Sequence, residues 1–226
     1  MDCRDENTLK PLVEKYLGSL KSNPESEKWI DRNIEGPKGL TVKKIPMELS
    51  VPKSTVVVNF TKDINYNPYN RQAVRVIKGI LDLRYNETIR EEEGGTYGVG
   101  TSLSATQFPK GQFKATISFD CDPARAEELK LIVYGELEAL YTTGPNQTDL
   151  DKSVNNILKT REESKLHNSY WSSVLFSYYY GGIDYNNPEN YEDILHSFTL
   201  KDIQKIAKEF FEKADVVDLI FEPAKE

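Results

Sequence analysis

Residues Thr88 to Thr101, with the sequence TIREEEGGTYGVGT, decide how the rest of the chain is interpreted. A charged run typical of a helix stops at Gly94-Gly95, and a segment of small and β-branched residues follows. The double glycine predicts a left-handed helix end, because glycine adopts positive φ at no steric cost. Arg90 precedes this break and Tyr97 follows it. The stretch therefore predicts a helix that turns sharply into a strand and brings these two side chains to one side.

The N-terminal part of the chain predicts a separate helix and a linker. Apolar residues recur at helical spacing from Leu9 to Leu20. Residues Ser22 to Lys38 are polar and are interrupted by proline and glycine, as in a connecting loop. We therefore divide the chain into two parts. Residues 1–39 are a helix and linker, the tail end of a preceding segment that packs on the domain, and residues 40–226 are the domain itself.

The domain begins with two strand signals and a long helix. The strands are expected at Leu40 to Leu49, where Pro46 indicates an edge strand or a bulge, and at Thr55 to Thr61, which is rich in β-branched residues. A helix is expected from about Asn67, its N-cap, to Glu92. Apolar residues cover much of its circumference, which predicts that it is buried between two layers.

The second half of the domain predicts a hairpin, several helices and a last strand. The hairpin comprises Tyr97 to Thr106 and Gln112 to Cys121. The expected helix starts are Asp122-Pro123, Thr148 as a capping box with Asp151, Ser169, and Thr199, and Val216 to Phe221 is the final strand. This order predicts an α+β fold, with an antiparallel or mixed sheet and helices packed mainly on one face.

Composition excludes several classes of function. The chain has 226 residues and a net charge of −7, and it shows no basic patch of the kind that binds nucleic acid. No apolar run approaches the roughly 18 residues that span a membrane, so we expect no membrane span. The start of the chain has neither a basic nor an apolar region, so we expect no signal peptide. Two isolated cysteines leave the compartment open, and a periplasmic or cytoplasmic location in a bacterium fits equally.

The common catalytic motifs are missing from the sequence. His167 and His196 have no ligand partner at metal spacing, and neither H-E-x-x-H nor H-x-x-E-H occurs, so we expect no metal and no cofactor in this chain. The glycines of residues 94–100 follow a helix and precede a strand, which is the reverse of a phosphate-binding loop. The acidic run of Glu91, Glu92 and Glu93 opposes the helix dipole, and its role stays open.

Three segments of the sequence resemble the pitrilysin/insulinase-type zinc peptidases, which include the mitochondrial processing peptidase. Residues 9–20, LKPLVEKYLGSL, look like a characteristic helix of that family. The segment from Ile80 to Val99, which contains RYNETIREEEGGTYGV, resembles its signature around an arginine and a tyrosine. Residues 169–203, which include TLKDI, are similar to its closing helical region. These segments occur in the order and spacing that the family shows, and the resemblance extends over most of the chain.

The resemblance implies a function that the residues alone do not define. It implies the C-terminal, non-zinc domain of a zinc endopeptidase, which closes the substrate chamber over a zinc-bearing N-terminal half in the same chain or in a partner subunit. Arg90 and Tyr97 match the family's substrate-contacting pair in type and spacing. The arginine would hold a backbone carbonyl of the peptide substrate, and the tyrosine would donate to the peptide or to the oxyanion. The zinc would lie in the parent enzyme or partner, and this fragment alone would not catalyse the reaction.

Other interpretations stay open at this point. On pattern alone, Arg90 fits a helix-end arginine that pairs with carboxylates, and Tyr97 fits a half-buried strand tyrosine. The same fold also serves as an inactive scaffold or assembly domain, and the chain could be a free-standing peptide-binding module. Whether the parent is an active enzyme is therefore left undecided by the sequence.

Overall fold

A computed structural model describes residues 5–22, 30, 32–48, 52–92 and 98–224, with the backbone alone for residues 90–92. The chain separates into two compact units, residues 1–34 and 35–226. The division predicted at residue 39 and the packing of the N-terminal helix on the domain stay predictions. The first unit contains helix α1, Glu6–Tyr16, which begins three residues before the expected start and buries none of its residues.

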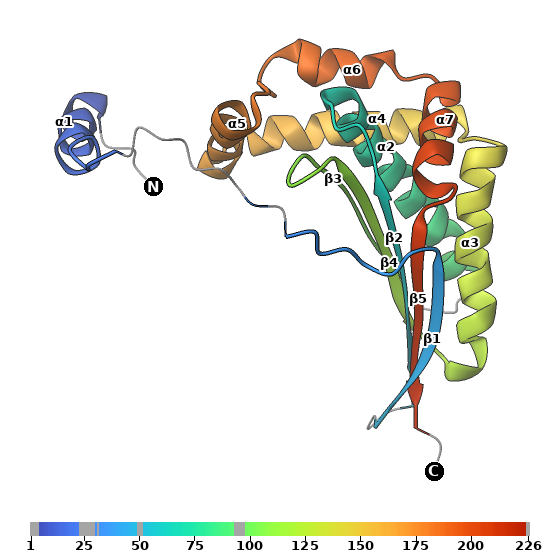
Figure 1. The fold of residues 1–226 in the computed structure, drawn as a ribbon. Helices are drawn as coiled ribbons and strands as arrows, with labels where there is room; N and C mark the ends of the chain where they lie inside the picture. Colours follow the sequence, from blue (N-terminus) through green and yellow to red (C-terminus); the bar gives the residue numbers. More distant parts are fainter. Residues whose placement is uncertain (1–4, 23–29, 31, 49–51, 93–97, 225–226) are drawn as a thin grey trace. The chain divides into compact units, whose positions relative to one another are not determined.

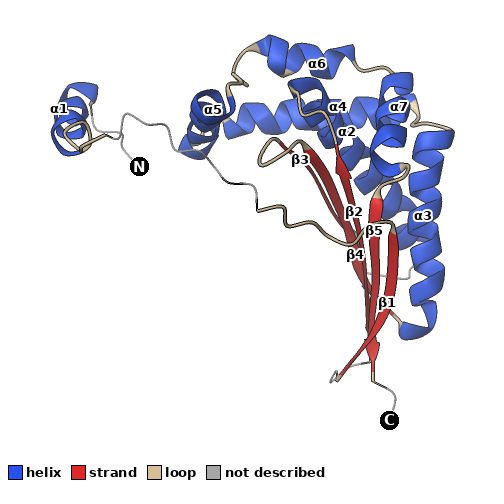
Figure 2. Ribbon diagram, viewed as in Figure 1, coloured by secondary structure: helices blue, strands red, loops and turns tan. Residues whose placement is uncertain are grey.

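The second unit is a five-stranded sheet with helices on one face, as Figures 1 and 2 show. The strands are β1 (Leu40–Met47), β2 (Ser54–Asp63), β3 (Gly100–Thr106), β4 (Gln112–Cys121) and β5 (Asp215–Pro223). The α-helices are α2 (Pro68–Tyr85), α3 (Ala126–Thr142), α4 (Gln147–Ser164), α5 (Asn168–Gly181), α6 (Glu192–Ser197) and α7 (Leu200–Phe211). A π-helix, η1 (Asn86–Glu92), follows α2, and two 3-10 turns lie at Pro123–Arg125 and Pro188–Asn190. The predicted α+β class is confirmed.

The strand order is β1-β5-β2-β4-β3, and the sheet is mixed. The hairpin of β3 and β4 pairs antiparallel as predicted, and β2 pairs antiparallel with both β4 and β5. The last strand, β5, lies between β1 and β2 and pairs parallel with β1. Pro46 therefore lies in an edge strand, where its missing N–H costs no ladder hydrogen bond.

The core lies between the helices and one face of β2 and β4. Alternate residues of both strands are buried, as the period of two along a strand requires. Phe60 and Phe113 pack edge-to-face against Phe211 of α7, with ring centroids 5.2 and 5.1 Å apart. The opposite face of β3 and β4 presents small polar side chains, among them Ser102, Ser104 and Thr116. No helix that the structure describes between residues 35 and 224 covers this face (Figure 2).

Several predicted boundaries are corrected by the structure. The α-helix that begins after Asn67 ends at Tyr85, and the chain continues to Glu92 as a π-helix. Strand β3 begins at Gly100, three residues later than predicted. The predicted helix end at Gly94-Gly95 lies outside the described residues.

The helix caps follow the prediction at three positions and depart from it at one. Asn67, Asp122 and Thr199 each accept a backbone N–H with the side chain, and Thr199 forms a full capping box with Asp202. Asp122 caps a 3-10 turn that leads into α3, rather than α3 itself. The predicted cap at Thr148 is wrong, because the Asn146 side chain accepts the N–H of Asp149 and α4 begins at Gln147. Asparagine ranks above threonine as an N-cap residue, and the Asn146 side-chain oxygen is the atom that accepts this N–H.

Helix α2 lies between the sheet and α4, as the apolar coverage of its circumference predicted. Two of its contacts require small residues. Ser153 of α4 is buried and its hydroxyl donates to the Val76 carbonyl oxygen at 3.0 Å. A Cβ atom added at Gly79 would lie 2.2 Å from the Ser153 Oγ atom and 3.0 Å from its Cβ atom. The close approach of α2 and α4 therefore depends on glycine at position 79.

We expect Gly79→Ala to lower the free energy of unfolding by about 1–3 kcal/mol, because Ser153 must move and lose its hydrogen bond. Alanine is the better helix former, so propensity alone would raise stability by about 1 kcal/mol. Gly135→Ala in α3 is the matched control, since a Cβ atom there meets no atom of a described residue within 4 Å. Urea unfolding should show opposite signs for the two variants. Two stabilising substitutions would contradict the described packing of α2 on α4.

Cys121 ends β4 and is buried. Burial, together with the nearby carboxylates of Asp120 and Asp122, raises the pKa of its thiol to about 11. Because the thiolate is the reactive form, we expect alkylation of Cys121 in a Cys3→Ser variant to be more than tenfold slower in the folded chain than in urea. The folded-state rate should keep rising with pH between 8 and 10. A plateau below pH 9 would show that the thiol is not buried and that its pKa is not raised.

Candidate functional site

The predicted site residues lie in and beside the connection between α2 and β3. Arg90 belongs to the π-helix η1, and its side chain is not described. Tyr97 lies outside the described residues. The structure therefore places the backbone of Arg90 and leaves the pairing of the two side chains as a prediction.

The described residues on both sides of this connection are firmly anchored. Ile89, beside Arg90, is fully buried in the core. Thr88 donates its hydroxyl to the Arg84 carbonyl oxygen at 2.7 Å, which satisfies one acceptor where the α-helix gives way to the π-helix. On the strand side, the Thr101 hydroxyl donates to the Asp82 carboxylate, and Lys78 pairs with Asp82 at 2.6 Å. The backbone of Arg90 therefore lies in a helical segment whose preceding residues are fixed to the core and to β3.

Helix α2 is held from the opposite side by a second set of polar contacts. Arg84 donates to the Gly144 carbonyl oxygen at 3.0 Å and lies 3.6 Å from the Asp149 carboxylate. Tyr85 is buried and its hydroxyl lies 3.4 Å from the Val133 carbonyl oxygen. Burial, with a contribution from Glu136, raises the pKa of the Tyr85 hydroxyl well above its usual value, so it is a neutral packing residue. These contacts position the end of α2.

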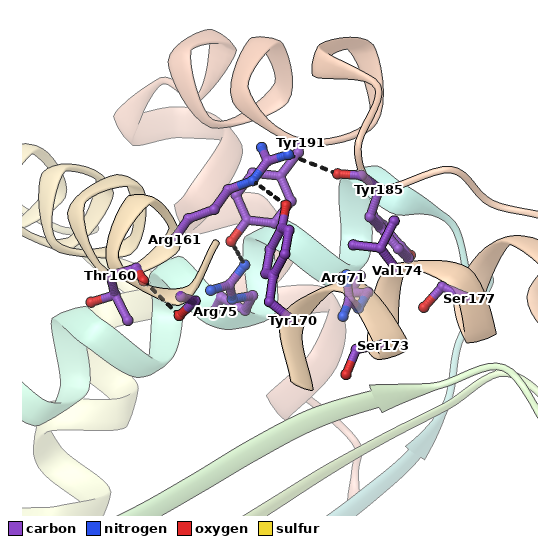
Figure 3. Close-up of a pocket in the computed structure, with 11 residues that line it drawn as sticks. Arg71, Arg75, Thr160, Arg161, Tyr170, Ser173, Val174, Ser177, Tyr185 and Tyr191 are labelled. Atoms are coloured by element: carbon purple, nitrogen blue, oxygen red, sulfur yellow. Dashed lines mark hydrogen bonds between the residues drawn. The ribbon is translucent and has the colours of Figure 1, made fainter. Parts of the chain in front are cut away.

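A polar pocket that sequence reasoning missed lies between α2, α4 and α5, and Figure 3 shows it. It encloses about 300 Å³ and is lined by Arg71 and Arg75 of α2 and Arg161 of α4. The i, i+4 spacing of the two α2 arginines was visible in the sequence and places them on one helix face. Arg161 is distant in the sequence, so its position became apparent only from the packing of α4.

Metal ligands do not converge in the described residues. No group of three or more His, Cys, Asp or Glu side chains in this part of the chain could hold a metal ion. His167 directly precedes α5 and His196 lies in the last turn of α6. Among the described residues, no helix is both long and apolar enough to cross a membrane.

Comparison with known proteins defines the class of this fold. The family model described as the peptidase M16 inactive domain matches residues 4–157, more than half of the chain. The chain belongs to this family, and the resemblance to insulinase-type zinc peptidases is confirmed.

Particular relatives agree with this assignment. The chain is 25% identical over 148 residues to the probable zinc protease PqqL of Haemophilus influenzae, which covers 66% of this chain and 16% of that protein. The periplasmic protease PqqL from Escherichia coli has the same fold, with a TM-score of 0.77, 19% identity, and coverage of 97% of this chain and 24% of that one. The first half of that protease also matches, with a TM-score of 0.70, 12% identity, and coverage of 95% and 49%. The chain therefore spans about a quarter or less of these full-length relatives.

Proposed function

We propose that this chain is the non-zinc domain of a zinc endopeptidase, where it closes the substrate chamber and contacts the peptide through Arg90 and Tyr97. The observation that carries the proposal is the match to the M16 inactive domain over a chain that lacks the H-x-x-E-H motif. The zinc and the activated water it supplies belong to the N-terminal half, in the same protein or in a partner subunit. The E. coli relative, of which a first half has been solved separately, supports such a division.

The two side chains have the chemistry that the proposal requires. A guanidinium is always charged and offers several N–H donors, so Arg90 can hold a backbone carbonyl of an extended peptide. A phenol is a good hydrogen-bond donor, and Tyr97 can donate to the oxygen that becomes negative as the peptide bond is attacked. A donor placed in this way is worth about 3–4 kcal/mol of transition-state stabilisation. Ile89 is anchored in the core and Thr101 on Asp82, so the described residues on both sides of the connection are held in place.

Exposed aromatic residues support a partner for this domain. Helix α5 buries none of its residues. Phe176 and Tyr179 are 63% and 81% exposed, and Phe176 stacks on Tyr180 with ring centroids 4.9 Å apart. Large apolar side chains grouped in this way are typical of surfaces that another protein covers. The zinc-bearing half is the partner we propose.

The experiment that tests this function uses the full-length parent or the assembled pair of halves. We expect it to bind one zinc per H-x-x-E-H motif and to cleave an unfolded peptide, with activity lost to a chelator and restored by zinc. Omitting this chain should abolish cleavage while zinc binding persists. Absence of both stoichiometric zinc binding and cleavage would favour the inactive scaffold, and peptide binding by these 226 residues alone would favour a binding module.

A further inference from the structure

The pocket between α2, α4 and α5 is unusual for an acidic protein, because cations and hydroxyl groups line it. Among the described residues, its lining contains three arginines and no aspartate or glutamate, in a chain of net charge −7. Serine, threonine and tyrosine hydroxyls complete its polar lining, with Tyr170, Ser173 and Ser177 contributed by α5. All of these groups can donate hydrogen bonds.

The buried arginine forms the wall of this pocket and has its charge balanced. Arg161 forms an ion pair with Glu192, and it donates to the Tyr170 hydroxyl at 3.0 Å and to the Tyr185 carbonyl oxygen at 2.9 Å. Its guanidinium also lies 3.8 Å from the ring centroid of Tyr191. Figure 3 shows Arg161 beside Tyr170 and Tyr191, which it holds in place. Burial opposes its charge, but the bonds to Tyr170 and Glu192 prevail and raise the pKa of Arg161.

The two arginines of α2 have no such compensation. Arg71 lies over the ring of Tyr185, 3.9 Å from its centroid, and Arg75 lies 5.0 Å from the centroid of Tyr191. Arg75 also donates to the Gln72 side chain at 3.1 Å and to the Tyr191 hydroxyl. Within the part of the chain that the structure describes, neither guanidinium forms an ion pair with a carboxylate.

These contacts hold the two guanidinium groups in place and leave their charges available to a ligand. The aromatic rings restrict both arginines at little cost, because a guanidinium stacks well on an aromatic face. Arginine side chains held in place lose less conformational entropy when a ligand binds. A carboxylate accepts two parallel hydrogen bonds from one guanidinium, and the surrounding hydroxyls can donate to its remaining lone pairs. A cation would be repelled, and an apolar group would leave these donors without acceptors.

We propose that this pocket binds the carboxylate of a peptide, from an aspartate or glutamate side chain, with Arg71 and Arg75 as its ligands. That the carboxylate belongs to a peptide rests on the proposed function, and the oxyanion chemistry rests on the pocket alone. The pocket would then give the enzyme a preference for peptides that carry an acidic residue.

Calorimetric titration of the 226-residue chain tests this site without the zinc-bearing half. The probes are a blocked ten-residue peptide with one central glutamate, the same peptide with glutamine, and inorganic phosphate. We expect the glutamate peptide to bind at least tenfold more tightly than the glutamine peptide. Arg75→Gln and Arg71→Gln should each remove most of that preference, whereas Arg125→Gln, which removes a guanidinium from the 3-10 turn before α3, should keep it.

The outcomes separate the site from the proposed function. Equal binding of the two peptides, with phosphate bound, would overturn the peptide ligand and assign the pocket to a free anion. A glutamate preference that survives both pocket variants would overturn the site itself. Thermal unfolding of each variant verifies that the fold is intact. The titration measures binding and no cleavage. Either failure therefore leaves the proposed roles of Arg90 and Tyr97 unaffected, and turnover measurements test those roles.

Discussion

Tyr97→Phe in the assembled enzyme is expected to lower kcat by about 10²–10³-fold and to leave KM almost unchanged. Phenylalanine keeps the ring and removes only the hydroxyl donor, which on the proposed function acts on charge that develops in the transition state. An interaction made only in the transition state affects kcat and kcat/KM equally. Steady-state kinetics with an unfolded peptide substrate measures both constants. Tyr141→Phe on helix α3, which has no part in the proposed substrate site or in the proposed contact with the zinc-bearing half, is the matched control and should change neither.

Arg90→Ala tests the other half of the pair and should give a different result. A guanidinium that holds a backbone carbonyl binds substrate and transition state alike, so its loss should raise KM more than it lowers kcat. Arg90→Lys keeps the charge but loses the planar set of donors, and it should recover only part of the binding. Unchanged kinetics in both Tyr97→Phe and Arg90→Ala would show that the pair has no contact with substrate.

Lys130→Met is expected to lower the free energy of unfolding by about 3–5 kcal/mol, because it leaves a carboxylate buried without its cation. Lys130 of α3 and Asp218 of β5 are both buried, with 3.2 Å between the Lys130 Nζ and Asp218 Oδ2 atoms. The Tyr134 hydroxyl donates to the same Oδ2 atom at 3.2 Å, and no described residue forms a hydrogen bond with Oδ1. Asp218 therefore depends on Lys130 for most of its compensation. Chemical denaturation measures the loss.

Two controls separate the buried pair from ordinary surface charge. Lys53→Met breaks an exposed pair with Asp120, in which both side chains are about half exposed, and should cost less than about 1 kcal/mol. The double variant Lys130→Met/Asp218→Leu removes both charges and should recover much of the loss. If Lys130→Met costs no more than Lys53→Met, the described burial of this pair is wrong.

The elements that were predicted well are those with a local physical cause. The β-branched run of β2 and the alternation in β4 define both strands nearly to the residue. Thr199 and Asp202 form a capping box from side chains three positions apart. Such signals depend on neighbours along the chain, which the sequence displays directly.

The features that were missed depend on contacts between distant residues. The π-helix after Tyr85 has ordinary helical composition, and nothing in its seven residues distinguishes it from α-helix. The parallel pairing of β1 with β5 joins the two ends of the domain. Helix α6 has only six residues, too few for a periodic pattern. The two candidate sites differ in the same way. Arg90 and Tyr97 were singled out by a family resemblance that follows one continuous stretch of sequence, whereas Arg161 and Arg71 come to line one pocket only in the folded chain.

On the proposed function, this domain reaches the peptide in a site that another half completes, and photocrosslinking at position 97 measures whether it does. A benzoylphenylalanine in place of Tyr97, in the assembled enzyme, should crosslink a bound peptide at residues next to the cleaved bond, as mass spectrometry would map. The same group in place of Leu131, which is 67% exposed on helix α3 and has no part in either proposed site, should give little product. Peptide crosslinking at position 97 no stronger than at position 131 would show that residue 97 does not lie beside the substrate.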